Sequence, residues 1–124
     1  MRIFLTKTLA RFVRREEISD QALREAIERA ERGLVDADLG DGLIKQRVAR
    51  KGKGSSGGYR TLIGYRRGER AVFVFGFAKK DQENVDASAL KSVRAVAVSW
   101  MNADMSRIAI GLLQGEIQEV PYDA

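Results

Sequence analysis

The apolar positions of this chain follow a helical spacing at its start, a strand pattern in its middle and a helical spacing again toward its end. In the first segment, Leu9, Phe12 and Val13 recur at helical intervals. Thr6 or Thr8 is the candidate N-cap, because a short hydroxyl side chain can accept a hydrogen bond from a free amide of the first turn. The pattern predicts a short helix that ends near residue 17.

A second, longer helix is predicted between Ser19 and Gly33. Ser19 is its candidate N-cap, Ile18 is placed for a hydrophobic staple, and Gly33 suits the left-handed position that follows a helix. Its apolar face repeats at i, i+3, i+4 and i+7 and comprises Leu23, Ala26, Ile27 and Ala30. We expect the two helices to form an antiparallel hairpin that packs on a sheet.

The middle of the chain predicts that sheet. Residues 71–77 (AVFVFGF) are continuously apolar, which indicates a central strand covered on both faces. Residues 51–58 (KGKGSSGG) are too rich in glycine and serine to predict regular structure. The predicted strands are residues 34–39, 43–50, 59–66 and 71–77, with a turn at 40–42 and a tight hairpin loop at 67–70.

The last third predicts two more helices and a short final strand. One helix runs from about residue 88 to residue 101, and the next begins after Asp104, its candidate cap, and ends at Gly115. Residues 117–120 predict a short strand. The expected fold class is therefore α+β, with an N-terminal helical hairpin packed on a small, mostly antiparallel sheet and followed by C-terminal helices.

The composition narrows the possible chemistry. The 124 residues include neither cysteine nor histidine, so thiol chemistry is excluded and the commonest general base and metal ligand are both missing. Catalysis would have to use Lys, Arg, Tyr, Asp, Glu, Ser or Thr, and no cofactor or metal is expected. The sequence shows neither an apolar run of membrane-spanning length nor the apolar core of a signal peptide, so we expect a cytoplasmic protein without membrane association.

Positive charge is concentrated in the middle third of the chain. Residues 43–80 carry 11 lysines and arginines against one acidic residue, whereas the segments on either side are slightly acidic. A patch of one sign favours a polyanionic partner, usually nucleic acid. The simpler interpretation is a surface kept soluble by its charge.

The most basic part of this segment is KGKGSSGGYR, residues 51–60. Its glycines would let backbone amides approach a phosphate, Lys51 and Lys53 supply flexible charges, and Arg60 can bind phosphate with two nitrogens. Tyr59 adds a ring that could stack on a base. The segment lacks the P-loop pattern, and a long hairpin loop without function is the alternative.

A second pair of cations, Lys79 and Lys80, follows the apolar strand. If residues 59–66 and 71–77 pair as a hairpin, Arg60 lies opposite residue 77 or its neighbour, and the two lysines converge with Arg60 at one end of the sheet. Lysines that merely cap a strand end are the alternative.

These segments resemble a known family. The SGGYR start of a strand and the GFAKKDQENV run after an apolar strand resemble the RelE/ParE superfamily of type II toxins, more narrowly its RelE/HigB-like members, over roughly residues 1–101. The resemblance implies a RelE-like fold and an mRNA interferase, an endoribonuclease that needs no metal and cuts mRNA on the ribosome. It also implies a cognate antitoxin, typically DNA-binding and encoded next door. We expect one toxin domain over residues 1–124, with 102–124 as a C-terminal extension.

The resemblance assigns roles to individual residues. It implies that Lys53 or Lys51 acts as the base, that Arg60 stabilises the phosphate, and that Lys80, where the family has a later arginine, stabilises charge or acts as the acid. Neighbouring cations disfavour the charged form of a lysine, which would suit it to act as a base. The residues expected to bind RNA are Lys45, Arg47, Arg50, Tyr59 and Lys79.

One position departs from the family. Asp86 stands where RelE has a tyrosine that stacks on an mRNA base, and a carboxylate cannot stack. Tyr59 or Phe77 could serve instead, and Asp86 could cap the helix that follows it. Three functions stay open: a ribosome-dependent mRNA endonuclease, a non-catalytic toxin of the same fold such as a ParE-like gyrase inhibitor, and an RNA-binding module.

Overall fold

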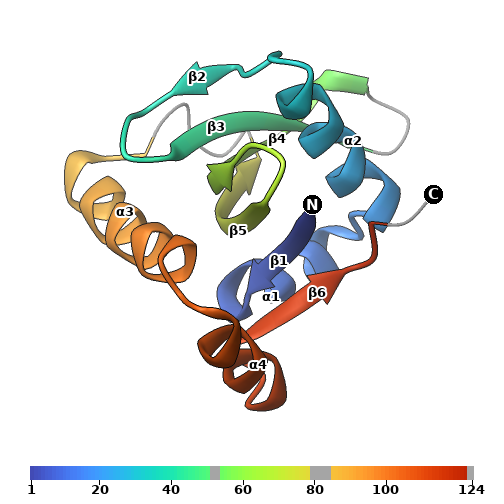
Figure 1. Ribbon diagram of the computed structural model, residues 1–124. Coiled ribbons are helices and arrows are strands. Elements are labelled where there is room, and N and C mark those ends of the chain that lie inside the picture. The colour runs from blue at the N-terminus through green and yellow to red at the C-terminus, as the bar shows by residue number, and fades with distance from the viewer. Residues whose placement is uncertain (51–53, 79–84, 123–124) are drawn as a thin grey trace.

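The computed structural model describes residues 1–50, 54–78 and 85–122. In this part of the chain, four helices surround one six-stranded sheet, in agreement with the predicted α+β class (Figure 1). The elements are β1 (Arg2–Thr6), α1 (Lys7–Glu16), α2 (Asp20–Glu31), β2 (Ala37–Asp38), β3 (Leu43–Arg50), β4 (Gly54–Arg66), β5 (Arg70–Ala78), α3 (Ala87–Met101), α4 (Met105–Leu113) and β6 (Ile117–Val120).

The chain begins with a strand, so the expectation that a helical hairpin comes first is wrong in its order. Ile3, Phe4 and Leu5 are almost completely buried in β1, which is covered on both faces. Three apolar residues in a row gave too short a pattern to distinguish a buried strand from a helix. Thr6 then caps α1, accepting a hydrogen bond from the amide of Leu9 at 3.3 Å, and is the correct choice of the two candidate caps.

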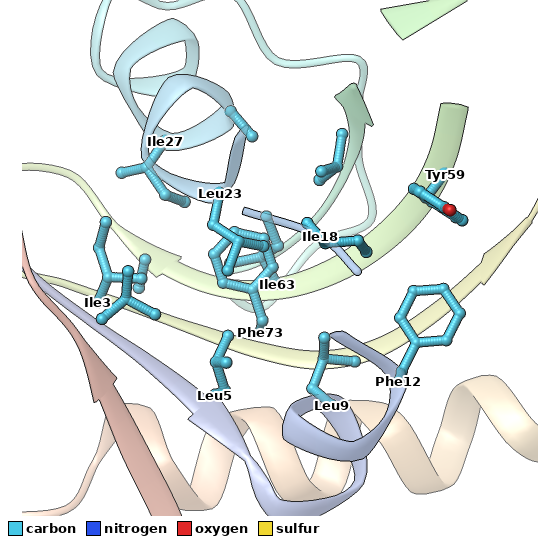
Figure 2. Packing of buried hydrophobic residues seen from close by; sticks show 14 of the residues in the cluster. Ile3, Leu5, Leu9, Phe12, Ile18, Leu23, Ile27, Tyr59, Ile63 and Phe73 are labelled. Carbon is cyan, nitrogen blue, oxygen red and sulfur yellow. The ribbon is translucent and has the colours of Figure 1, made fainter. Parts of the chain in front are cut away.

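The strand order is β2-β3-β4-β5-β1-β6, and the pairing is antiparallel except between β1 and β5. β5 lies inside the sheet between β4 and β1, which confirms the prediction of a central strand. α1 and α2 cover one face and α3 covers the other (Figure 1). Figure 2 shows the cluster on the α1–α2 face, where Leu9 and Phe12 of α1 and Leu23 and Ile27 of α2 meet the sheet.

The α3 face is filled by a second apolar cluster. Val93, Ala97 and Trp100 of α3 pack against apolar side chains of β1, β3, β4 and β5. At the carboxyl end of α3, the guanidinium of Arg70 donates to the carbonyl oxygens of Trp100 at 2.9 Å and Ala103 at 2.8 Å. These bonds tie β5 to the carbonyls at and just beyond the end of α3, one of which, that of Trp100, also accepts the Ala103 amide at 3.3 Å. No helix in the described ranges is long and apolar enough to cross a membrane.

β4 is longer than the sequence predicted. It begins at Gly54, so the expectation that residues 54–58 are irregular is wrong; residues 51–53 lie outside the described residues. β3 and β4 stay paired through a register shift between Val48 and Arg50. Gly58 permits the close approach of the two strands, because a Cβ at this position would lie 2.2 Å from the Val48 carbonyl oxygen. Gly58 therefore has a packing role within the sheet.

A buried amide joins β3 to its neighbours. The side chain of Gln46 is fully buried and donates to the carbonyl oxygens of Ala26 at 2.9 Å and Leu34 at 3.0 Å. It also accepts a hydrogen bond from the Asp36 amide at 2.9 Å. The segment before β2 is held by these bonds, and the strand predicted over residues 34–39 forms a ladder only at Ala37–Asp38.

Candidate nucleic-acid interface

Arg60 lies in β4 at the end of the sheet where the glycine-rich segment enters. Its partner on β5 is Phe77, which confirms the predicted hairpin pairing, and its partner on β3 is Arg47. Directly opposed residues project from the same face of a sheet. Leu62 lies two residues further along β4, so its side chain is on the same face as that of Arg60, and it belongs to the cluster under α3. The Arg47–Arg60–Phe77 row therefore lies on the α3 face, beyond that cluster.

The two arginines of this row differ in their partners. Asp36 holds Arg47: its carboxylate lies 3.2 Å from the guanidinium and also accepts the Arg47 amide at 2.7 Å. Arg60 is only partly exposed, and its buried Nη1 has no hydrogen-bond partner among the described residues. A buried donor without an acceptor costs about 1–3 kcal/mol, and more when it is charged. A phosphate oxygen at this position would supply the missing acceptor and balance the charge.

Other predicted site residues share this face. Lys45 pairs with Leu62, so its partly exposed side chain lies in the row next to Arg60. On β5, Phe75 pairs with Leu62, and the rings of Phe75 and Phe77 lie 6.1 Å apart at 48°. Phe75 is partly exposed, whereas only 5% of Phe77 is exposed. Phe75 is not among the site residues predicted from the sequence, because the apolar run in which it lies predicts burial.

Tyr59 does not belong to this surface, so its assignment as an RNA-binding residue is corrected. Only 3% of it is exposed, it lies on the α1–α2 face, and its ring packs edge-on against Phe12 at 5.5 Å (Figure 2). Its hydroxyl donates to the Glu16 carbonyl oxygen at 3.4 Å. Burial raises the pKa of the Tyr59 hydroxyl, so it stays protonated and acts as a core residue.

Arg50 also lies apart from the row. The register shift after Val48 brings Arg50 opposite Gly54 rather than beside Arg60. Its positive charge acts on the Tyr59 hydroxyl and partly opposes the rise in the pKa of that group. The structure therefore brings together Lys45, Arg47 and Arg60 and leaves Arg50 outside this group.

The remaining predicted residues are Lys51, Lys53, Lys79 and Lys80, and all four lie outside the described residues. Asp86 is described, and it caps α3 by accepting a hydrogen bond from the Ala89 amide at 2.8 Å. The prediction that Asp86 caps the following helix is confirmed. Across residues 1–50, 54–78 and 85–122, no three acidic side chains come together in a way that could hold a metal ion.

Fold and site together define a small α+β protein that carries Lys45, Arg47 and Arg60 on one face of its sheet. A profile described as "RelE toxin of RelE / RelB toxin-antitoxin system" matches residues 1–120, nearly the whole chain. The chain belongs to this family of toxins, and the match extends beyond the approximate range 1–101 expected from the sequence. No curated protein sequence matches the chain at a significant level.

Proposed function

We propose that this toxin arrests translation by cutting mRNA on the ribosome. The observation that carries the proposal is the pairing of Arg60 with Arg47 on one sheet face, with the buried Nη1 of Arg60 lacking an acceptor among the described residues. Two adjacent cations repel each other, and an anion bound between them offsets this repulsion. We expect this anion to be a phosphodiester of the mRNA.

The chemistry assigned to the site is an internal transesterification. The RNA 2′-oxygen attacks the adjacent phosphorus, the bond to the 5′-oxygen breaks, and a 2′,3′-cyclic phosphate and a 5′-hydroxyl end result. Lys53 or Lys51 takes the proton from the 2′-hydroxyl, and Lys80 stabilises charge or returns a proton to the leaving 5′-oxygen. Arg60 binds the phosphate oxygens, whose negative charge increases in the transition state.

The partners follow from this reaction and from the family. The toxin would act in the cytoplasm on ribosome-bound mRNA, and a cognate antitoxin, DNA-binding and encoded by the adjacent gene, would neutralise it. Lys45, Arg47 and Lys79 would bind the RNA backbone beside Arg60. Such phosphate contacts carry little sequence information, so codon preference must come from other residues.

Induced expression of the Arg60→Ala variant in bacterial cells tests the proposal. The wild type should stop protein synthesis and leave mRNA fragments with new 5′-hydroxyl ends, and Arg60→Ala should do neither. Arg67→Ala removes an exposed cation from the turn at the other end of the β4–β5 hairpin and should remain toxic. Urea unfolding of the purified variants must show that both are folded.

The outcomes separate the competing functions. A fully toxic, folded Arg60→Ala variant would contradict the catalytic assignment. DNA damage without mRNA cleavage would indicate a gyrase inhibitor of the ParE kind, and RNA binding without any effect on growth would indicate a binding module.

A further inference from the structure

Beside the Arg60 site, the described residues leave one edge of β5 without a pairing strand. β1 pairs with β5 only as far as Leu5 and Phe73, because the chain turns directly into α1 at Lys7. Thr6 closes this junction by donating its hydroxyl proton to the Val74 carbonyl oxygen at 3.3 Å. In the described part of the chain, the rest of β5, residues 75–78, therefore pairs with β4 alone.

A hollow of about 430 Å³ lies between this edge and α1. Arg11, Phe12 and Arg15 line it from the helix, and Phe75 and Phe77 line it from the strand. A second hollow of about 410 Å³ begins at Phe75 and extends between the start of α1 and α3. Each volume lies within the roughly 300–1,000 Å³ of typical small-ligand sites.

The lining of the first hollow combines positive charge with aromatic rings. Arg15 lies over the Phe12 ring, 5.5 Å from its centre, and 68% of the Arg15 side chain is exposed. Arg11 is exposed one helical turn earlier. Glu16 also lines the hollow and lies 3.5 Å from Arg15, but water screens the exposed Arg15 side chain and keeps this ion pair weak. Single-stranded nucleic acid is bound by cations that follow its backbone and by rings on which its bases stack.

We propose that this hollow binds the nucleotide next to the one held at Arg60, with its base on Phe75 and its phosphate at Arg11 and Arg15. Phe75 lies two residues from Phe77, the partner of Arg60, which is about 7 Å along the strand. The two binding positions are therefore adjacent. This inference rests on the proposed function and supplies a stacking ring, which Asp86 cannot provide because it caps α3.

Phe75 is a better platform than the two alternatives considered from the sequence. Tyr59 is buried on the opposite face, and only 5% of Phe77 is exposed. Phe75 is partly exposed and borders both hollows, so a base could reach its ring from the side of α1 or of α3. Gly76 allows α1 to lie close to β5, because a Cβ there would lie 2.8 Å from the Phe12 ring and push α1 away from the strand.

The test measures binding of a fluorescent single-stranded RNA decamer to the full-length protein by anisotropy at low salt. Phe75→Leu removes the ring and should weaken binding about 5- to 150-fold, the range for loss of one stacked base. Phe75→Tyr keeps a ring and should bind like the wild type. Arg15→Gln should weaken binding and lower its salt dependence, whereas Arg14→Gln, which faces a different hollow on the same helix, should change both much less.

Translation arrest in cells separates the two proposals. If Arg60→Ala abolishes arrest while folded Phe75→Leu binds RNA and arrests translation like the wild type, the hollow does not bind RNA and the proposed function still stands. If the wild-type protein neither binds the decamer nor arrests translation, both proposals fail. If Phe75→Leu and Arg15→Gln retain RNA binding but escape neutralisation by the co-expressed neighbouring gene product, the hollow is a protein interface and this inference is overturned.

Discussion

Arg60 lies directly opposite Arg47 across the β3–β4 ladder, and both guanidinium groups project from the same face of the sheet. Like charges directly opposed across a ladder destabilise it. Asp36 relieves only part of this repulsion, because it pairs with Arg47 and leaves the Arg60 Nη1 without an acceptor among the described residues. Under the proposed function a bound phosphate would offset this repulsion, and proteins commonly retain such local conflicts at functional sites.

Loss of Arg60 should change the salt dependence of RNA binding. For single-stranded RNA, the slope of log affinity against log salt concentration is about −0.7 for each phosphate neutralised. Arg60→Gln should therefore make the slope shallower by about 0.7 in a titration with a fluorescent RNA decamer. Arg67→Gln removes the same charge from the far turn and should change the slope by less than half as much. Equal slopes for wild type and Arg60→Gln would contradict phosphate binding at Arg60.

Replacement of Tyr59 by phenylalanine should leave toxicity intact. The ring would still pack against Phe12, and only the long hydrogen bond to the Glu16 carbonyl oxygen would be lost, at a cost of about 1 kcal/mol or less in the free energy of unfolding. Tyr59→Ala should cost about 3–5 kcal/mol, as expected for a buried aromatic side chain. Growth arrest and urea unfolding measure the two effects. A folded but non-toxic Tyr59→Phe variant would show that the hydroxyl takes part in function.

A methyl group at position 58 should disturb the site through the sheet. The Cβ of a Gly58→Ala variant would lie 2.2 Å from the Val48 carbonyl oxygen, so the backbones of β3 and β4 must separate. We expect a loss of about 1–3 kcal/mol in unfolding free energy and weaker RNA binding, since Arg47 and Arg60 lie on these strands.

Gly64→Ala on the same strand is the matched control for Gly58→Ala. Its added Cβ would meet side-chain atoms of Met101 at 3.0 Å and Ala97 at 3.2 Å, and no backbone atom as close as the 2.2 Å contact at Gly58, so it should cost less. Equal effects of the two substitutions on RNA binding would show that the close approach at Gly58 does not position the arginines.

The ion pair between β1 and β6 should contribute to stability only above acidic pH. Arg2 donates two hydrogen bonds of 2.9 Å to Glu119, and these bonds lower the pKa of the Glu119 carboxyl. Because the pKa is lower in the folded state, the contribution is complete above the unfolded value of about 4.3 and is lost as pH falls through the folded value. Near neutral pH, Glu119→Gln should lower the unfolding free energy by less than about 1 kcal/mol, since both side chains are over a third exposed.

Urea unfolding at several pH values measures this difference. Glu28→Gln, at an exposed position on α2, is the control and should change stability little at any pH. A difference between wild type and Glu119→Gln that persists in strong acid would show that the effect comes from packing and not from the ion pair.

The sequence by itself determined much of this fold. Helical spacing and caps located α2, α3 and α4, because Ser19, Asp86 and Asp104 act through bonds to amides three residues away. The continuous apolar run 71–77 identified the central strand, and simple hairpin counting placed Arg60 opposite residue 77. Such features depend on neighbours in the chain and can be read from local patterns.

Other features were decided only by tertiary structure. The predicted order of elements lacked β1. This segment is a strand because it pairs with β5 and β6, which lie far away in the sequence and leave no local pattern in residues 2–6. Gly58 is required by a carbonyl on another strand, and the face to which Tyr59 and Phe75 belong depends on strand register. A shift of one residue would exchange the two faces. The sequence therefore supplied the cations of the site, and the packing of the sheet decided which of them lie together.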